Sequence, residues 1–327
     1  MNILILSAGT RNKIVQYFKR ELAGRGKVIA TDCSNLAPAV YEADRFYLVP
    51  RISEPGYIET ILDICKKEEI AGVFSLIDPE LSLLAKERER FLAIGTCPIV
   101  SPYELVETCF DKYRMYQLLM DMGIPTGRCY VDKEEFYRGV EKGDISYPVF
   151  VKPVKGSASI NINKVYGRKE IEVLFDLYDD LMIQEYMDGT EFGADVYVDI
   201  ISGRCTSIFL KKKIKMRAGE TDKSVSVKEE ELFRLLQNFV EKCGFAGMID
   251  IDIFKIEDEY YISEVNPRFG GGYPHAYECG VNMPIRILHN LEGVCGEEEI
   301  GHYKAGVCMM KYNEVMIKDM EDTEIIG

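Results

Sequence analysis

The sequence predicts a mixed fold, with an N-terminal α/β domain built on a parallel sheet and α+β lobes after it. Short apolar runs alternate with amphipathic stretches over the first hundred residues, which is the pattern of parallel strands joined by helices. The later strands are longer and alternate apolar with polar residues, as antiparallel strands do. The length of 327 residues exceeds one average domain, so two or three packed lobes are expected.

Composition and charge narrow the class of protein. Hydrophobic residues make up 47% and charged residues 29% of the chain, as in ordinary globular proteins. No apolar run approaches the ~20 residues of a membrane helix, and MNILILSAGT at the N-terminus reads as a strand without a signal-peptide pattern. We therefore expect a cytoplasmic protein with no membrane partner. A formal charge of −14 would repel a phosphate backbone, which excludes nucleic acid as a partner.

The residue types that bind metals favour magnesium over zinc. Ten cysteines occur without a CxxC pair and only three histidines are present, so zinc lacks ligands. In a long chain without a signal peptide, reduced and mostly buried thiols are expected. The sequence stays compatible with a magnesium site, because magnesium prefers carboxylate and phosphate oxygens.

The first domain is expected over residues 1–100. Strands 2–7 and 71–77 are apolar enough to be buried on both faces. Ligands of such a sheet lie beyond the carboxyl ends of its strands, which here carry SAGTR, DCSN and IDPE. SAGTRNK has one glycine where a dinucleotide loop needs three, which disfavours an NAD enzyme. The predicted strands are 2–7, 27–32, 45–50, 71–77 and 97–101, and the predicted helices are 12–22, 57–69 and 80–92.

Two further segments and a tail complete the predicted organisation. Residues 102–122 form one helical stretch, which Gly123 and Pro125 end. The predicted domains after residue 100 are 101–186, 187–312 and a tail at 313–327. Later strands are expected at 147–162, 181–186, 191–201, 205–213, 248–254 and 260–266, with helices at 172–181 and 228–244.

The segment YPVFVKPVKGSASI (147–160) has the features of a phosphate site. Lys152 stands at a strand end, and Lys155 and a loop of small residues follow it. Small residues let backbone N–H groups approach phosphate oxygens, and a lysine adds a positive charge. A surface hairpin is the alternative, and no P-loop pattern occurs in the sequence.

The segment LMIQEYMDGTEFGADVYV (181–198) offers groups that suit a nucleoside. Gln184 and Glu185 follow an apolar strand, and Glu191 lies six residues beyond Glu185. A strand of this kind can present backbone groups to a purine edge, and a carboxylate beyond the turn can accept hydrogen bonds from ribose hydroxyls. An ordinary hairpin with acidic turn residues is the alternative.

Four oxygen ligands are expected on two neighbouring strands. IDIDIF (249–254) and YYISEVNPR (260–268) are joined by a short polar turn, so Asp250 and Asp252 can face Glu264 and Asn266 across the ladder. That many carboxylates on one sheet face would repel each other, and a divalent cation resolves the conflict. Hard oxygen ligands with vacancies for phosphate oxygens are the usual way to hold magnesium.

Arg268 and three glycines complete this stretch. Period-2 spacing points Glu264, Asn266 and Arg268 to one face of the strand. Arg268 would stabilise negative charge on a transferred group, and Gly270 to Gly272 would let a substrate approach the backbone. A strand that ends in a glycine turn explains the glycines but not the acid, the amide and the arginine together.

The order of these motifs resembles the ATP-grasp superfamily, and most closely single-copy proteins similar to half of the carbamoyl-phosphate synthase large subunit. The motifs that carry the resemblance are DK before a helix, VFVKP with its small-residue loop, IQEYMDGTEFGADV, GMIDIDIF and SEVNPRFGGG. The resemblance implies an α/β domain followed by two lobes that hold ATP between them.

The resemblance also implies roles for individual residues. Either Asp250 or Asp252 aligns with the acidic metal ligand on the first of the two strands, with Asp250 slightly favoured, and Arg268 matches the arginine beside the transferred phosphoryl group. The implied ATP-binding residues are Lys112, Lys152, Lys155, Gly156, Ser157, Gln184, Glu185, Tyr186, Met187 and Glu191, and the implied metal ligands include Glu264 and Asn266.

The expected function is a carboxylate–amine ligase that uses ATP and Mg²⁺, or Mn²⁺ in its place, through an acylphosphate. The basic segment 211–224 would add Lys215 and Arg217 near the γ-phosphate, or form a solvated loop. The candidates for holding the acid or the amine are Thr10, Arg11, Asp78, Glu80 and His275.

Alternatives of other classes stay open. The chain has one ATP-grasp half and nothing that resembles a glutaminase, so carbamoyl phosphate is in doubt as its product. Three alternatives remain. The protein could be a phosphotransferase that makes an acyl or carbamoyl phosphate, a subunit that needs a partner chain, or a nucleotide-binding module without catalysis. Small-molecule acids and amines are the expected partners, and the apolar N-terminal helices are compatible with a homodimer.

Overall fold

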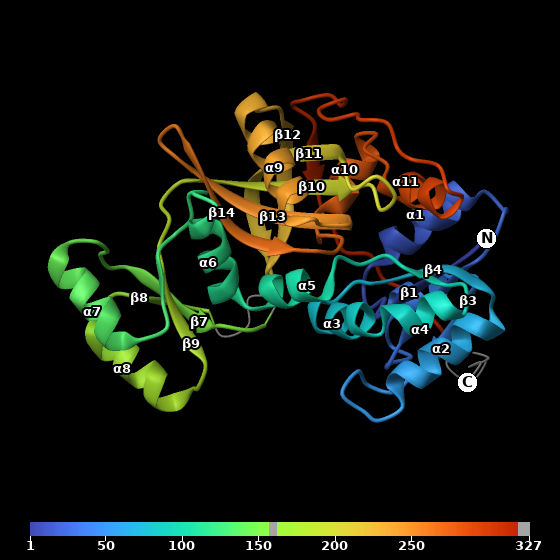
Figure 1. The fold of residues 1–327 in the computed structure, drawn as a ribbon, viewed down its shortest axis with the longest axis horizontal. Helices are drawn as coiled ribbons and strands as arrows, with labels where there is room; N and C mark the ends of the chain where they lie inside the picture. Colours follow the sequence, from blue (N-terminus) through green and yellow to red (C-terminus); the bar gives the residue numbers. More distant parts are fainter. Residues whose placement is uncertain (157–161, 320–327) are drawn as a thin grey trace.

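The computed structural model describes residues 1–156 and 162–319 and contains three sheets. A five-stranded parallel sheet comes first, a four-stranded antiparallel sheet second and a six-stranded antiparallel sheet third. Figure 1 shows the four-stranded sheet at one end of the long axis, the six-stranded sheet in the middle and the parallel sheet at the other end. The predicted fold class is confirmed. No helix in the two described ranges is long and apolar enough to cross a membrane.

The N-terminal domain has strand order β3-β2-β1-β4-β5. The first strand, β1, is buried over four of its five residues, as its apolar sequence predicts. The helix expected over 80–92 is interrupted at Glu87, which caps one helix and precedes another. The strands are β1 Asn2–Leu6, β2 Val28–Asp32, β3 Arg45–Leu48, β4 Ile70–Ser75 and β5 Cys97–Pro98; the helices are α1 Asn12–Leu22, η1 Pro38–Glu42, α2 Tyr57–Lys67, α3 Asp78–Lys86 and α4 Arg88–Ala93.

The single helix expected over 102–122 is wrong, because the chain forms α5 (Tyr103–Phe110) and α6 (Lys112–Asp121) with Asp111 between them. Asp111 has extended backbone angles, and its side chain accepts hydrogen bonds from the N–H groups of the second and third residues of α6, at 3.1 and 3.0 Å. An aspartate that satisfies free N–H groups in this way starts a new helix. Lys112 is therefore the first residue of α6.

The small lobe comprises the four-stranded sheet and two helices, with strand order β6-β9-β7-β8. Helix α7 was not expected, although Asp132 caps its first turn through the N–H of Glu135 and Gly143 ends it with a φ of 78°. The lobe has its own hydrophobic core around Phe136, Val151 and Ile183. Its elements are β6 Cys129–Tyr130, α7 Lys133–Lys142, β7 Val149–Pro153, β8 Asn163–Val165, α8 Arg168–Leu177 and β9 Leu181–Glu185.

The large lobe comprises the six-stranded sheet, with order β14-β13-β10-β11-β12-β15, and three helices. The basic segment 211–224 is not a loop, because β11 continues to Arg217 and β12 begins at Glu220. We call the turn between these two strands, with the strand ends beside it, the β11–β12 hairpin. The elements are β10 Thr190–Val198, β11 Cys205–Arg217, β12 Glu220–Val227, α9 Glu230–Cys243, β13 Gly247–Ile256, β14 Glu259–Asn266, α10 Tyr273–Glu278, α11 Met283–Leu291 and β15 Cys308–Met310.

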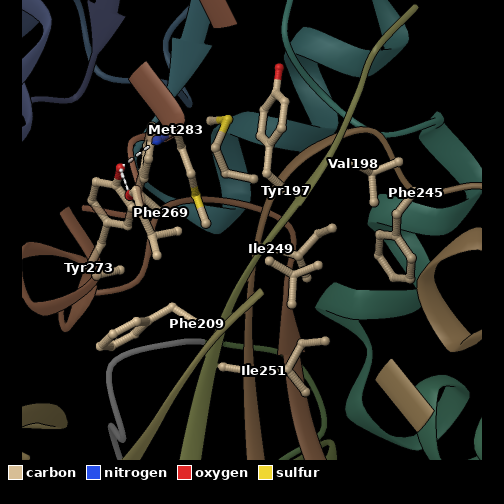
Figure 2. Packing of buried hydrophobic residues seen from close by; sticks show 14 of the residues in the cluster. Tyr197, Val198, Phe209, Phe245, Ile249, Ile251, Phe269, Tyr273 and Met283 are labelled. Atoms are coloured by element: carbon tan, nitrogen blue, oxygen red, sulfur yellow. Dashed lines mark hydrogen bonds between the residues drawn. The ribbon is translucent and has the colours of Figure 1, made fainter. Parts of the chain in front are cut away.

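One hydrophobic core joins the N-terminal domain to the large lobe. Phe74 of β4 packs between Phe18 of α1 and Phe269, with ring centroids 5.0 and 5.6 Å away. Figure 2 shows Phe269 beside Tyr273 and Met283; the Tyr273 hydroxyl accepts a hydrogen bond from the Met283 N–H at 2.8 Å. The N-terminal domain and the large lobe are therefore packed together, whereas the small lobe has a separate core.

The ten cysteines are free thiols, as expected, but only four of them are buried. The expectation that most are buried is wrong. Cys33 follows the end of β2 and Cys308 begins the edge strand β15, where the chain is exposed.

Candidate active site

A cleft of about 320 Å³ lies where the three parts of the chain meet. The N-terminal domain contributes the ends of β4 and α1, the small lobe contributes β7 and β9, and the large lobe contributes β13, β14 and the β11–β12 hairpin. The charged and amide side chains that line the cleft are Arg11, Asp78, Lys152, Gln184, Glu185, Glu191, Lys213, Glu220, Asp250, Asp252, Glu264, Asn266 and Arg268.

The small-lobe end of the cleft combines apolar walls with a buried lysine. Phe150, Met187 and Phe254 line it, and Lys152 on β7 is only 6% exposed. Within the described ranges, the Lys152 ammonium donates no hydrogen bond to a protein acceptor. An ammonium that is buried and unpaired at a cleft wall attracts an anion.

Lys112 and Glu185, also predicted to bind ATP, have protein partners in the described part of the chain, unlike Lys152. The Lys112 ammonium donates to the Gly156 carbonyl, and burial lowers the pKa of Lys112. Glu185 lines the cleft while one of its carboxylate oxygens accepts from the Arg128 N–H at 3.0 Å.

Four of the residues predicted to bind nucleotide do not line the cleft, Lys112 among them, and their roles stay predictions. The Tyr186 ring packs against Phe150 and under the Lys164 ammonium instead. Lys155 and Gly156 are exposed, because this stretch leaves β7 at the surface. Ser157 lies outside the described residues.

The four predicted oxygen ligands lie on one face of β13 and β14. In the antiparallel ladder Asp250 lies opposite Asn266, and Asp252 lies opposite Glu264. All four line the cleft. Cross-strand pairing therefore gathers three carboxylates and one amide, as the period-2 spacing in the sequence indicates.

Lys213 was missed by sequence reasoning, although it holds two of the predicted residues. Its ammonium contacts Asp252 at 2.6 Å and Glu191 at 2.8 Å, and its side chain is 4% exposed. These carboxylates raise the pKa of Lys213 against the opposing effect of burial. The available signal was the spacing of Lys211 and Lys213, which puts both on the same face of β11.

Asp250 differs from Asp252 because it has no cationic contact. Within the two described ranges its carboxylate accepts no hydrogen bond and makes no ion pair within 4 Å. Burial, followed by repulsion from Asp252, raises the pKa of Asp250 to about 7. A Cβ atom on Gly270 would lie 2.3 Å from this carboxylate, so only glycine fits at that position.

The donor set fits a hard divalent cation. Asp250, Glu264 and Asn266 offer carboxylate and amide oxygens, which magnesium prefers, and a cation would relieve the repulsion around Asp250. No group of three or more His, Cys, Asp or Glu side chains in the described ranges is close enough to enclose an ion by itself. An ion at this position would take its other ligands from phosphate and water, as magnesium does at phosphate sites.

Arg268 is fixed by a residue of the N-terminal domain. Its guanidinium makes two contacts with the carboxylate of Asp78, at 2.9 and 3.0 Å, and a third with the Phe269 carbonyl at 3.1 Å. Asp78 begins α3 directly after β4, at the carboxyl end of the parallel sheet. The two-point contact sets the plane of the guanidinium and leaves its remaining N–H groups for the cleft.

A second ion pair closes the end of the cleft beyond Arg268. Arg11, just before α1, contacts Glu220 on the β11–β12 hairpin at 2.8 Å. Lys311 contacts the other carboxylate oxygen of Glu220 at 2.7 Å. Arg11 and Glu220 both line the cleft, whereas Thr10 is exposed and does not. The expectation for Thr10 is wrong, because its side chain points to solvent at the tight turn after β1.

Lys215 and Arg217 do not line the cleft, so their expected placement near the γ-phosphate is wrong. The pairing of β11 with β12 shifts register on both sides of Lys215. This irregularity reverses the alternation of side chains, so Met216 faces the cleft instead. Lys215 is exposed, and Arg217 pairs with Asp222 at 2.8 Å.

Glu80 was expected near the substrate, and this is wrong. Its carboxylate accepts hydrogen bonds from the hydroxyls of Tyr57 and Ser75, and the residue is 1% exposed. Burial raises the pKa of Glu80. Glu80 therefore ties α2 to β4 inside the N-terminal domain, and it does not reach the cleft.

His275 was also expected near the substrate and is instead buried under the large-lobe sheet. Its ring nitrogens contact the Ser224 hydroxyl at 2.8 Å and the Val307 carbonyl at 3.0 Å, and the residue is 2% exposed. Burial, reinforced by the charge of Lys211, lowers the pKa of His275 to about 4. The imidazole is neutral at pH 7 and joins β12 to the segment before β15.

The low pKa of His275 predicts a loss of stability in mild acid. The folded state resists protonation down to about pH 4, whereas the unfolded chain accepts a proton near pH 6.5. The unfolded state therefore binds more protons between these values, and stability falls as pH is lowered through this window, by on the order of 3 kcal/mol. Urea unfolding of the wild type and of H275Q at pH 7 and pH 4.5 measures this. Equal losses in the two proteins would contradict the assignment.

Comparison with known proteins agrees with this geometry. The family described as the ATP-grasp domain matches residues 109–272, and the PylC-like N-terminal domain matches residues 3–100. The arginine-specific carbamoyl phosphate synthase large chain of Geobacillus stearothermophilus is 25% identical over 242 residues, which are 69% of this chain and 22% of that protein. The chain thus spans less than a quarter of that relative.

Two further comparisons cover most of the chain. The 3-methyl-D-ornithine–L-lysine ligase of Methanosarcina acetivorans is 24% identical over 279 residues, which are 84% of this chain and 69% of that protein. The biotin carboxylase domain of the 2-oxoglutarate carboxylase of Hydrogenobacter thermophilus, solved as a dimer with MgADP, ADP and bicarbonate, superposes with a TM-score of 0.74 at 16% identity. That superposition covers 94% of this chain and 73% of the other, and at this identity it shows a shared fold.

Proposed function

Because the chain belongs to the ATP-grasp family, we propose that it is a ligase that joins a small carboxylic acid to an amine, with ATP converted to ADP and phosphate. One observation carries the proposal. A single cleft brings together the oxygen ligands of β13 and β14, an arginine held in place by Asp78, and the unpaired ammonium of Lys152. These groups suit a triphosphate with its metal at one end and a reacting carboxylate at the other.

The small-lobe end of the cleft is proposed to bind ATP. Phe150, Met187 and Phe254 supply apolar surface for adenine, and Gln184 lies at the same wall. Lys152, with Lys112 nearby, neutralises phosphate oxygens. Glu191 is proposed to accept hydrogen bonds from the ribose hydroxyls. This requires the Lys213 ammonium to share the Glu191 carboxylate with the ribose or to release it.

Asp250, Glu264 and Asn266 are proposed to hold Mg²⁺, or Mn²⁺, against the phosphates. The ion, when bound, neutralises charge on the β- and γ-phosphates. Asp250 must be ionised for this role, and Asp252 contributes negative charge beside it while paired with Lys213. Gly270 keeps the approach to the Asp250 carboxylate open.

The chemistry takes two steps. A carboxylate oxygen of the acid attacks the γ-phosphorus, the bond to the β–γ bridging oxygen breaks, and ADP leaves with that electron pair. The nitrogen of a neutral amine then attacks the acyl carbon, the bond to the phosphate oxygen breaks, and the amine proton is released to water as the amide forms. Arg268 faces the transferred group and stabilises its charge in both steps.

An acylphosphate must be shielded from water, and the arrangement of cores suggests how. The small lobe has its own core, whereas the N-terminal domain and large lobe share one. We propose that the small lobe, which carries Lys152, closes on the larger body as a unit when ATP binds. A homodimer and a cytoplasmic location remain predictions from the sequence.

Release of ADP tests the function. With Mg²⁺ and ATP, we expect ADP to form only when both an acid and an amine are present, and one amide to form per ADP. The measurement is a coupled assay across a matrix of amino acids, hydroxy acids, bicarbonate and ammonia, with the amide identified by mass spectrometry. Turnover with bicarbonate or one acid alone, without an amine, would replace the ligase by a phosphotransferase that makes an acyl or carbamoyl phosphate.

A further inference from the structure

The ion pair between Arg11 and Glu220 has features of a substrate site. Arg11 comes from the N-terminal domain and Glu220 from the β11–β12 hairpin, so the pair crosses the cleft. Both residues line the cleft, and their side chains are 23% and 37% exposed. Neither end of the pair is enclosed by protein, so a small molecule can reach both charges from the cleft. A pair that served only to join two parts of the fold would not need this access.

Charges of both signs surround this pair. Arg11, Arg268 and Lys311 make ion pairs with Glu220 and Asp78. Burial acts to raise the pKa of Glu220, but Arg11, Lys311 and then Arg268 lower it below its ordinary value. A simple anion placed against Arg11 and Arg268 would meet the Glu220 carboxylate as well, and the repulsion would cost affinity. A molecule with a carboxylate and an adjacent ammonium meets both signs of charge.

The pair packs directly on glycine backbone. Gly271 lies against the pair, and a Cβ atom there would approach Arg11 Nη1 and Glu220 Oε2 to 2.7 Å. The pair therefore lies against bare backbone on one side, and a substrate approaches its two charges from the cleft. Asp78 and Arg268 bound the site toward the phosphate end.

We propose that the acid substrate is an α-amino acid, whose ammonium binds Glu220 and whose carboxylate faces Arg11 and Arg268. This inference rests on the proposed ligase function and specifies its substrate class. The amino acid separates Arg11 from Glu220 and replaces their ion pair with two of its own, so little electrostatic energy is lost on binding. The two charges of an α-amino acid are close together, because its ammonium nitrogen is two bonds from the carboxylate carbon. The same carboxylate must reach the γ-phosphate.

Paired substrates test the proposal in the full-length protein. ADP release is compared for the twenty common amino acids, their D-enantiomers and the matching 2-hydroxy acids, with Mg²⁺, ATP and a mixture of amines. We expect at least one amino acid to be used. Its hydroxy analogue should have a KM about 10- to 100-fold higher, because it lacks one charge-assisted hydrogen bond. Equal KM values for an amino acid and its hydroxy analogue would overturn the proposal.

The variant E220Q separates binding from a structural role. In E220Q we expect the KM for the amino acid to rise about 10- to 100-fold and kcat to change by less than about threefold. The KM for the hydroxy analogue should stay unchanged. E298Q, which alters an exposed pair with Arg204, is the matched control and should resemble the wild type. If E220Q raises both KM values equally, Glu220 acts only through the fold and the proposal fails.

Thermal unfolding keeps this test independent of turnover. An amino acid substrate should raise the Tm of the wild type and of E298Q in the presence of ADP and Mg²⁺, and should not raise the Tm of E220Q. Absence of any such shift across the amino acid panel overturns the inference. Amino acid shifts without ADP release under any condition would instead overturn the proposed ligase function and leave the binding site standing.

Discussion

Replacement of Arg268 by alanine is expected to lower kcat about a thousandfold, with little change in nucleotide affinity. Arg268 is the cation proposed to face the transferred phosphoryl group, and Asp78 already fixes its plane through two contacts. A preorganised donor or an arginine beside a transferred phosphate contributes about 10²- to 10⁵-fold to such reactions. The measurements are kcat for ADP release and the Kd for ADP with Mg²⁺.

The single substitution also has a structural consequence that must be separated from the catalytic one. In R268A the Asp78 carboxylate, whose side chain is 9% exposed, loses its partner and becomes a buried unpaired charge. The double variant D78N/R268M removes both charges and should unfold at nearly the wild-type urea concentration while remaining inactive. Recovery of activity in this double variant, or less than a tenfold loss in R268A, would remove Arg268 from the mechanism.

The conservative variant R268K refines the same prediction. Lysine keeps the positive charge but cannot make the two-point contact with Asp78. We expect kcat between those of the wild type and R268A, because a charge without a fixed direction stabilises the transferred group less. If R268K equals the wild type, charge alone is sufficient and the contact with Asp78 has no catalytic role.

Much of the site could be predicted because period-2 spacing on a strand is a strong constraint. Asp250, Asp252, Glu264 and Asn266 needed only two adjacent antiparallel strands to meet, and the register brings them together. The ion pairs of Lys213 could not be predicted, since its partners Glu191 and Asp252 lie on two other strands whose registers the sequence does not specify.

The N-terminal candidates show where strand-end reasoning loses precision. Asp78 and Glu80 follow β4 and were both expected near the substrate, but both belong to α3. Residues two apart on a helix differ by about 200° in direction, so one faces the cleft and the other the domain interior. The turn after β1 separates Arg11 and Thr10 in the same way. A prediction at a strand end thus identifies the neighbourhood but not the direction of each side chain.

The basic cluster KKKIKMR led to a different misinterpretation. Its charge indicated an anionic ligand, yet Lys211 and Lys213 are neutralised by acids of the protein itself. Lys215 and Arg217 are turned away by the shifted register of β11 and β12. Charge counting along one strand cannot reveal this, because the compensating acids come from β10 and β13.

The buried pair of Asp195 and Lys211 gives the largest expected effect on stability. The two side chains are 2% and 1% exposed, and their charged atoms lie 2.5 Å apart at the centre of the large-lobe sheet. Burial raises the pKa of Asp195 and the Lys211 ammonium opposes this rise. Gly193 and Gly272 make room for the lysine stem, since a Cβ atom on either would lie 2.9 Å from its Cε.

The variant D195A is therefore expected to lower the free energy of unfolding by about 3–5 kcal/mol, because it leaves the Lys211 ammonium buried without a partner. The measurement is urea unfolding at pH 7, with E298A as the control for loss of an exposed ion pair, which should cost less than about 1 kcal/mol. The double variant D195L/K211M removes both charges and should recover most of the loss, since apolar residues of similar volume replace a buried pair at little cost. If D195A unfolds at the same urea concentration as E298A, water reaches Lys211 and the pair does not stabilise the sheet that carries the cleft.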